Sequence, residues 1–336
     1  NTLGEAQTLL YALQDTYENN KIISLNILQS SDTSILELED AHFLKILLQT
    51  TFILASSTKP PDTVTAAYMF AFMVKSKKFE VHLIKFLLKQ VEEGVSVLPC
   101  EKDVLISITY SSSFIALLLL SGELLKHLRV AQRSLLDAAA YAPLYGVLAC
   151  IRSVIAQLDF KLLKDKLSLN QWTLLIQELI SLSIKVASVV EPVVCNSSPE
   201  GHLPMDTDSD SLLQLQATVR RAIGKRFQSA VVGSECASLE SDQVILDMVK
   251  THAVTAQILL LCCWRTHKEV SLLFGEISDK IPVKSASESI SSGILDIVQV
   301  LDIGEYFMRQ MTLVKHKGAF EQAYIGFSKL CCMLWR

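Results

Sequence analysis

Apolar residues recur three and four positions apart along most of this chain, and that spacing restricts its possible folds more than any other feature. In the first segment, one helical face would contain Leu3, Ala6, Leu9, Leu10, Leu13 and Tyr17. This spacing is typical of an amphipathic α-helix, whereas a half-buried strand alternates apolar and polar residues. Because no stretch of the sequence shows a convincing strand pattern, the sequence predicts an all-α fold.

Similar patterns predict a series of helices joined by short breaks. They span residues 21–29, 40–56, 62–78, 79–94, 101–130, 133–158, 169–190, 212–230, 241–265, 266–277, 287–314 and 318–335. We expect Asp62 to cap the helix that starts there, Pro143 to break one helix, and another break near Tyr110. Many of these helices are apolar on more than one face, which is typical of helices that lie between neighbours in a stack.

Stacked helices of this kind favour an α-solenoid of HEAT/armadillo-like helical repeats, because one helical hairpin cannot bury its apolar face alone. The predicted organisation has helical repeats in residues 1–190 and again in residues 212–336. Between them, residues 191–211 are acidic and rich in proline and serine, which predicts a surface loop. No repeat of fixed period is evident, so a single globular helical domain is the alternative.

The chain is apolar for a soluble protein, with 50% hydrophobic residues and a mean hydropathy of +0.34. Its longest unbroken apolar run, residues 66–74, is far shorter than the roughly twenty residues of a membrane span. We therefore expect buried core helices and no membrane span. Eight cysteines without a C-x-x-C motif, and no visible signal peptide, predict reduced thiols in a cytoplasmic protein. Because the chain begins at Asn1 and stops in mid-pattern, we expect a piece of a longer protein.

No motif in the sequence predicts a catalytic, cofactor-binding or metal-binding residue. The 12 glycines never form G-x-G, and the P-loop-like stretch has Val219 and Arg226 where glycine and serine or threonine are required. The acidic stretch that starts at Asp206 lacks the glycine and glutamate of a calcium loop. Cys263 and His267 are four residues apart on a predicted helix, but no ligand pair has zinc-finger spacing.

One short segment is strongly basic, although the chain as a whole has a net charge of −4. Arg220, Arg221, Lys225 and Arg226 lie close together, and no acidic residue occurs within residues 211–234. Like charges one helical turn apart repel each other, and a phosphate backbone would reverse this penalty. We therefore consider these four residues candidates for RNA or partner binding. The alternative is a solvated helix face.

A second group of polar residues interrupts an apolar stripe. Arg265, Lys268 and Glu269 share an arc of the predicted helix surface with apolar residues before and after them. Such charges are expected to be half buried and paired. Arg265 and Glu269 could pair with each other, and Trp264 could form a cation–π contact with Lys268. The group would be either an internal ion pair that fixes how two helices stack, or a polar notch that binds a partner loop or a phosphate.

The last predicted helix has an aromatic face and follows a basic triplet. The face consists of Phe320, Tyr324, Phe327, Cys331 and Trp335. Core packing accounts for this face, and Gly326 would allow the close approach of a neighbouring helix. Core packing does not account for Lys315 and Lys317, which flank His316 before the helix, so they are further candidates for RNA or partner binding.

Two stretches, CCWRTHKEVSLLFG from Cys262 and GAFEQAYIGFSKLCCMLW from Gly318, resemble the central domain of the THADA (thyroid adenoma-associated) family. The resemblance implies a very long, cytosolic, HEAT/armadillo-like protein related to the fungal regulatory subunit of a tRNA ribose 2′-O-methyltransferase. It also implies a small FtsJ-type catalytic partner that uses S-adenosylmethionine and methylates nucleotide 32 of the anticodon loop. In that family the helical subunit has no active site and helps to present the tRNA. An arginine-rich, RRSAG-like segment of the family is not found in this chain.

We therefore expect a non-catalytic scaffold or regulatory subunit, without a cofactor of its own, that supports an FtsJ-type methyltransferase and its tRNA. A basic concave face that includes the four clustered cations, and then Arg265 and Lys268, would make the RNA contact. The alternative hypothesis is a protein-only adaptor that binds partner helices or peptides and makes no RNA contact.

Overall fold

A computed structural model describes residues 8–9, 11–30, 41–75, 77–92, 111–160, 166–195, 242–284, 293–315 and 317–335. Their regular elements are α2 (Glu18–Ser30), α3 (Ala41–Ala55), α4 (Pro60–Met73), α5 (Lys77–Glu92), α7 (Ser112–Arg133), α8 (Leu135–Tyr141), α9 (Leu144–Ala156), α10 (Lys166–Val194), α12 (Asp242–Lys280), α13 (Ile297–Leu313) and α14 (Lys317–Trp335). Within these ranges the only β-type pairing is an isolated bridge between Val283 and Leu295. The predicted all-α class is confirmed.

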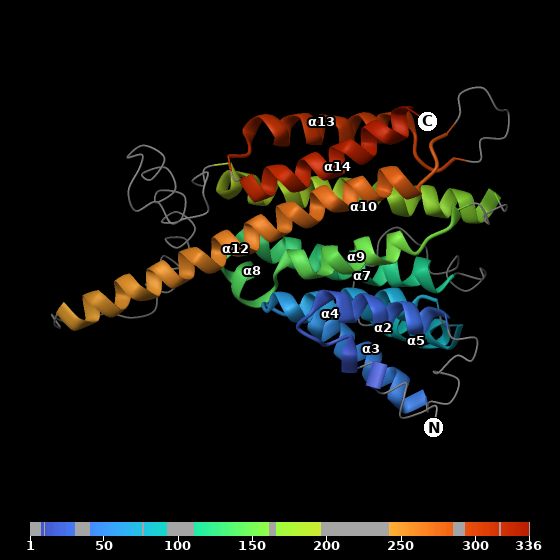
Figure 1. The fold of residues 1–336 in the computed structure, drawn as a ribbon, viewed down its shortest axis with the longest axis horizontal. Coiled ribbons are helices and arrows are strands. Elements are labelled where there is room, and N and C mark those ends of the chain that lie inside the picture. Colours follow the sequence, from blue (N-terminus) through green and yellow to red (C-terminus); the bar gives the residue numbers. More distant parts are fainter. Residues whose placement is uncertain are drawn as a thin grey trace.

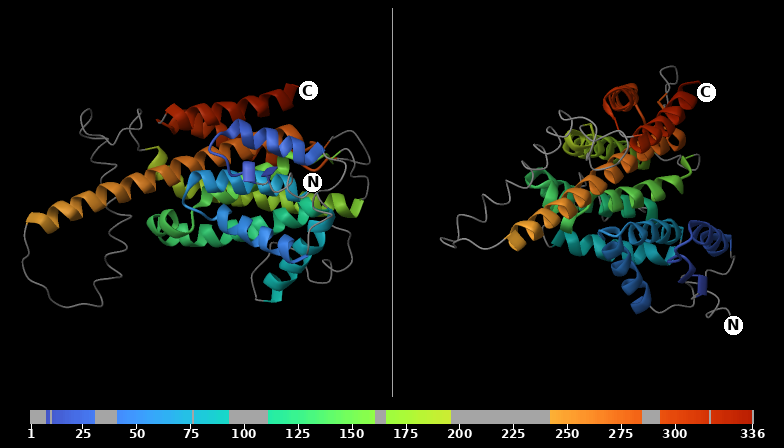
Figure 2. Two further views of the ribbon diagram at one scale, coloured as in Figure 1. Left: turned by 60° about the horizontal axis from the view of Figure 1, so that its bottom comes forward. Right: turned by 60° about the vertical axis from the view of Figure 1, so that its left-hand side comes forward.

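The helices lie in layers that follow the order of the chain, from α2–α5 through α7–α9 and then α10 and α12 to α13 and α14 (Figure 1). One helix of each layer packs on the next, so that α4 contacts α9, α9 contacts α12 and α12 contacts α14. The first described helices, α2–α5, and the last two, α13 and α14, therefore lie at opposite sides of the stack in Figure 1, and the right-hand view of Figure 2 shows the same separation.

Local capping explains where the central helices begin. The hydroxyl of Ser111 accepts a hydrogen bond from the backbone N–H of Phe114 at the start of α7, and Ser134 does the same for Asp137 in α8. The predicted break at Pro143 is confirmed, because α9 begins directly after it. The expected cap at Asp62 is wrong, because α4 begins two residues earlier with prolines in its first turn.

Two expected helix ends are also wrong. Helix α12 runs without a break through Arg265 and Thr266, where the sequence led us to expect two helices. No proline or glycine occurs in it before Gly275, so no local signal stops it, and its N-terminal half projects beyond the other helices (Figure 1). Helix α10 continues through Pro192 to Val194, so the first residues of the expected 191–211 loop are helical.

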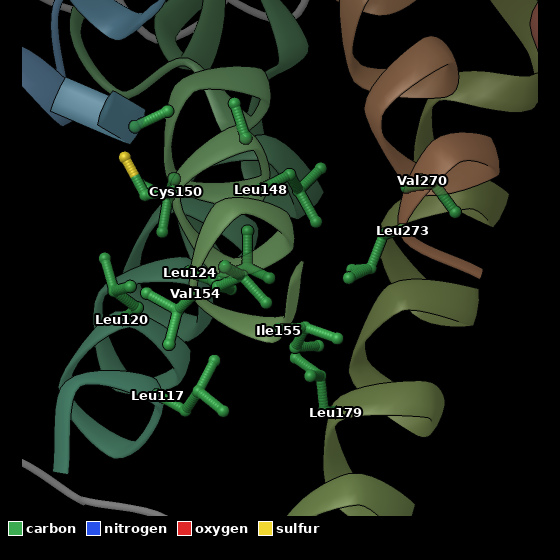
Figure 3. Close-up of a cluster of buried hydrophobic side chains, with 14 of the residues drawn as sticks. Leu117, Leu120, Leu124, Leu148, Cys150, Val154, Ile155, Leu179, Val270 and Leu273 are labelled. Carbon is green, nitrogen blue, oxygen red and sulfur yellow. The ribbon is translucent and has the colours of Figure 1, made fainter. Parts of the chain in front are cut away.

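A central part of the hydrophobic core lies where four helices meet. Figure 3 shows Leu117, Leu120 and Leu124 of α7, Leu148, Cys150, Val154 and Ile155 of α9, Leu179 of α10, and Val270 and Leu273 of α12. All ten residues are 0% exposed. Since complete burial of one such aliphatic side chain contributes roughly 1.5–3 kcal/mol, this cluster fixes α9 between α7 on one side and α10 with α12 on the other.

Among the residues that the structure describes, one helix, Leu169–Val194, is long and apolar enough by length and composition to cross a bilayer. The expectation of no membrane span counted only unbroken apolar runs, and it was too strict for this helix. Half of the most apolar 18-residue window of the helix is buried against the rest of the protein, including Leu179 and Ile180. Buried core helices satisfy the same length and composition test, so this one helix is weak evidence for a membrane span.

Candidate functional site

The polar group predicted on α12 lies at the junction between α12 and α9. Glu269 is 9% exposed, and its Oε2 accepts a hydrogen bond of 2.9 Å from Nε of Arg152 on α9. The expected pairing of Glu269 with Arg265 is therefore wrong, because α9 supplies the partner from across the helix interface. The expectation that this group is paired is confirmed for Glu269, which is buried rather than half buried.

Arg265 makes a different contact. Its guanidinium lies over the ring of Tyr145, 5.9 Å from the ring centroid, which is within the range of a cation–π interaction. Tyr145 is itself fixed, because its hydroxyl donates a 2.7 Å hydrogen bond to the carbonyl of Thr58. The Nε of Arg265 is buried and has no hydrogen-bond partner in the described part of the chain. Arg265 thus joins α12 to the first turn of α9 mainly by stacking.

The other polar residues of this stretch are also close to the helix interfaces. Trp264 and Lys268 are half buried, and Trp264 packs against the hydrophobic core. Thr266 and His267 are buried, and the Thr266 hydroxyl donates to the carbonyl of Cys262 within the same helix. The side chains of the predicted notch therefore mostly face protein, which fits the stacking role better than an open binding surface.

Buried cysteines surround this junction. Burial raises the pKa of the Cys262 thiol to about 11, and it raises the pKa values of Cys150 and Cys263 as well. A thiol must lose its proton to act as a nucleophile or a metal ligand, so these three thiols are expected to be unreactive. Among the described residues, no three histidine, cysteine, aspartate or glutamate side chains are close enough to hold a metal ion.

Helices α12 and α14 approach each other through glycines. A Cβ atom added at Gly275 would lie 2.8 Å from the Cα of Gly326, and one added at Gly326 would collide with the carbonyl of Ser271 and the ring of Phe307. The predicted role of Gly326 in close helix approach is confirmed. At the same contact the hydroxyls of Ser271 and Tyr306 are 2.8 Å apart, and Lys329 pairs with Glu276.

The aromatic face of α14 does not form the core as expected. The buried line of this helix consists of Ala319, Ala323, Gly326 and Leu330. Phe320, Tyr324 and Trp335 are 37%, 57% and 93% exposed, and Cys331 is exposed too. Only Phe327 is partly buried, with its ring 6.0 Å from that of Phe307. Small side chains on α14 allow α12 to approach more closely than aromatic side chains would. The small residues of α14 therefore face α12.

The structure describes only some of the predicted basic residues. Lys315 and Lys317 are exposed, and Lys317 lies 4.0 Å from Glu321 in a solvated pair. The clustered cations Arg220, Arg221, Lys225 and Arg226 lie outside the described residues, so their role stays a prediction. Sequence reasoning missed Arg152 and Tyr145, because a partner more than a hundred residues away leaves no local signal.

The fold and this junction define a class of protein: an all-α chain of packed helices whose central polar residues mainly bind one helix to another. Residues 174–336 match a family model described as THADA/TRM732, DUF2428. The resemblance to the THADA family is confirmed, and the chain belongs to the THADA/TRM732 family.

Curated relatives extend the match over nearly the whole chain. The human protein named tRNA (32-2′-O)-methyltransferase regulator THADA is 34% identical over 99% of this chain. The Drosophila melanogaster protein of that name is 30% identical over 98% of the chain, and Schizosaccharomyces pombe tRNA (32-2′-O)-methyltransferase regulator trm732 is 25% identical over 61%. The chain spans only 18% of the length of the human relative. No solved structure matches the chain.

Proposed function

We propose that this chain is part of a non-catalytic regulatory subunit that supports a tRNA ribose 2′-O-methyltransferase acting at nucleotide 32. The observation that carries the proposal is the 34% identity over 99% of the chain to a protein named as a regulator of that enzyme. A match of this extent covers the α9–α12 junction as well as the C-terminal helices.

The chemistry of the described residues supports a non-catalytic role. Arg152 and Glu269 satisfy each other, and burial keeps the thiols of Cys150, Cys262 and Cys263 protonated. A catalytic centre needs a nucleophile, acid or base held near an accessible pocket. The resemblance to the family implies that a separate catalytic partner of the FtsJ type would bind the methyl donor S-adenosylmethionine.

The finer architecture in this proposal is an α-solenoid of HEAT/armadillo-like repeats in the cytoplasm. The succession of layers from α4 through α9 and α12 to α14 supports it, because each layer contacts mainly its neighbours in sequence. A longer protein built in this way would offer an extended surface on which the methyltransferase and its tRNA are held together.

A methylation assay tests the proposal. A tRNA transcript is incubated with the FtsJ-type partner and S-adenosylmethionine, with and without the full-length protein that contains this chain. Methylation of nucleotide 32 is expected only in the presence of the protein, and the protein alone should transfer no methyl group. Equal methylation without the protein, or methyl transfer by the protein alone, would overturn the proposal.

A further inference from the structure

A groove of 230 Å³ lies between α10 and α13, on the side of the molecule away from the α4–α9 contact. Its walls include three carboxylates, Glu191, Asp302 and Glu305, and one cation, Arg309. Arg309 is already neutralised, because its Nε and Nη2 donate to the two carboxylate oxygens of Glu191 over 2.7 and 3.1 Å. Three negative charges less one positive charge leave the groove with a net charge of −2. Asp302 and Glu305 carry this excess, and Arg309 also attracts Glu305 electrostatically.

A buried amide in the same groove lacks a partner. Gln310 lines the groove and is 3% exposed, and its Oε1 has no hydrogen bond to any described residue. A buried carbonyl oxygen without a donor costs roughly 1–3 kcal/mol, so such groups usually mark a ligand, an ion or a water.

The remaining walls are apolar. Ile184 and Ala187 of α10 and Tyr306 of α13 also line the groove, and the hydroxyl of Tyr306 is already engaged with Ser271. An apolar wall beside a set of acceptors fits a molecule with an aliphatic stem and a cationic head that donates hydrogen bonds. Lysine and arginine side chains have this form.

The volume of the groove and its side chains further restrict the kind of ligand that it could bind. Pockets for drug-sized molecules usually measure about 300–1,000 Å³, so a groove of 230 Å³ suits a single side chain. A metal ion is disfavoured, because the described residues contain no group of three side chains arranged to ligate one. We propose that the α10–α13 groove binds one arginine or lysine side chain of a protein partner, with Asp302, Glu305 and Gln310 as the acceptors.

The first test is a ligand-observed NMR titration of the chain. The probes are Nα-acetyl-L-arginine methylamide, Nα-acetyl-L-lysine methylamide and the uncharged Nα-acetyl-L-citrulline methylamide. At least one cationic probe should bind, and it should bind more tightly than the citrulline probe. Equal binding of the citrulline probe, or no binding of either cationic probe, would overturn the proposal. Tighter binding of spermidine than of both side-chain probes would overturn it in favour of a small polyamine.

Two variants locate the binding. The double variant Asp302→Asn with Glu305→Gln removes the excess negative charges and should weaken binding of the cationic probe by roughly fivefold to tenfold. The matched control, Glu80→Gln with Glu321→Gln, makes the same charge change on α5 and α14 and should leave the affinity unchanged. Equal losses in both double variants would show that the effect is one of overall charge and would refute the site.

The variant Gln310→Met distinguishes a role of Gln310 in binding the probe from a role in stabilising the fold. The change keeps the length of the side chain but removes the unpartnered oxygen, so the thermal midpoint of unfolding should stay the same or rise, while the affinity for the cationic probe falls. A lower midpoint would show that Gln310 has a structural partner and would count against the proposal, as would unchanged affinity. Because none of these assays uses tRNA or the methyltransferase, their outcome is independent of the proposed regulatory function.

Discussion

Arg152 on α9 and Glu269 on α12 are 117 residues apart in the sequence, and their side chains meet in an ion pair of 2.9 Å. The two partners are buried to different extents, because 12% of the Glu269 side chain is exposed and 33% of the Arg152 side chain. The carboxylate therefore depends on the pair more than the guanidinium does, since water can still solvate part of Arg152. Removing the Arg152 donor should therefore cost more stability than removing the charge of Glu269.

Arg152→Met should lower the free energy of unfolding by about 2 kcal/mol, because it leaves the Glu269 carboxylate buried without its donor. Glu269→Gln should cost less, because a neutral amide can still accept a hydrogen bond and leaves a half-exposed cation. Urea unfolding followed by circular dichroism measures both. Glu321→Gln, which breaks the solvated pair with Lys317, is the control and should change nothing measurable. Equal costs for the first two variants would contradict the asymmetry.

Gly326→Ala should destabilise the protein by about 1–3 kcal/mol, because the added methyl group collides with the carbonyl of Ser271 and the ring of Phe307. Gly122→Ala in α7 is the matched control, since a Cβ atom there meets nothing within 4 Å. Alanine is the better helix former by about 1 kcal/mol, so the control should be stabilised. Thermal unfolding of the two variants should shift in opposite directions, and a shift in the same direction would mean that α12 and α14 do not pack through Gly326.

Acid should weaken the contact made by Glu123 on α7. The hydrogen bond from His127, supported by Lys126, lowers the pKa of the Glu123 carboxyl from 4.5 to about 2. Because the pKa is lower in the folded state, the stabilisation is fully present above pH 4.5 and is lost as the pH falls toward 2. The contribution is roughly 3 kcal/mol at most.

Glu123→Gln isolates this contribution. The variant should be less stable than the wild type at pH 6, and the difference between them should shrink between pH 4.5 and pH 2. Urea unfolding across this pH range measures the difference. A constant difference would mean that the carboxyl of Glu123 keeps an ordinary pKa in the folded protein.

The predicted basic segment can be tested through its salt dependence. Changing Arg220, Arg221, Lys225 and Arg226 to glutamate should weaken tRNA binding. It should also reduce the slope of log affinity against log salt by roughly one unit for each phosphate that the variant no longer neutralises. Gel-shift titrations at several salt concentrations measure both.

The control for this prediction makes the same change of charge elsewhere. Lys45, Lys59, Lys75 and Lys85 are exposed on or beside α3, α4 and α5, and changing all four to glutamate should leave the salt slope nearly unchanged. Unchanged tRNA binding in the basic-segment variant, or an equally large effect in the control, would remove this segment from any account of RNA recognition.

The sequence alone determined the class of the fold and most helix positions, because helical periodicity and prolines act over only a few residues. The break at Pro143 and the close approach at Gly326 are examples, since each depends on the geometry of the residue itself. The two predicted helix ends that were wrong, at Arg265 in α12 and before Pro192 in α10, show that a polar group or a single proline does not by itself end a helix.

Tertiary structure alone decided which partner each side chain has. Glu269 had an available cation four residues away in Arg265, yet it pairs with Arg152, because α9 crosses α12 at that turn and Arg265 is stacked on Tyr145. The same holds for α14, whose aromatic face is exposed while Ala323 and Gly326 are buried. An amphipathic pattern says that a helix has an inner face. Which face lies inside depends on how closely the neighbouring backbone can approach, and that distance is set by residues far away in the chain.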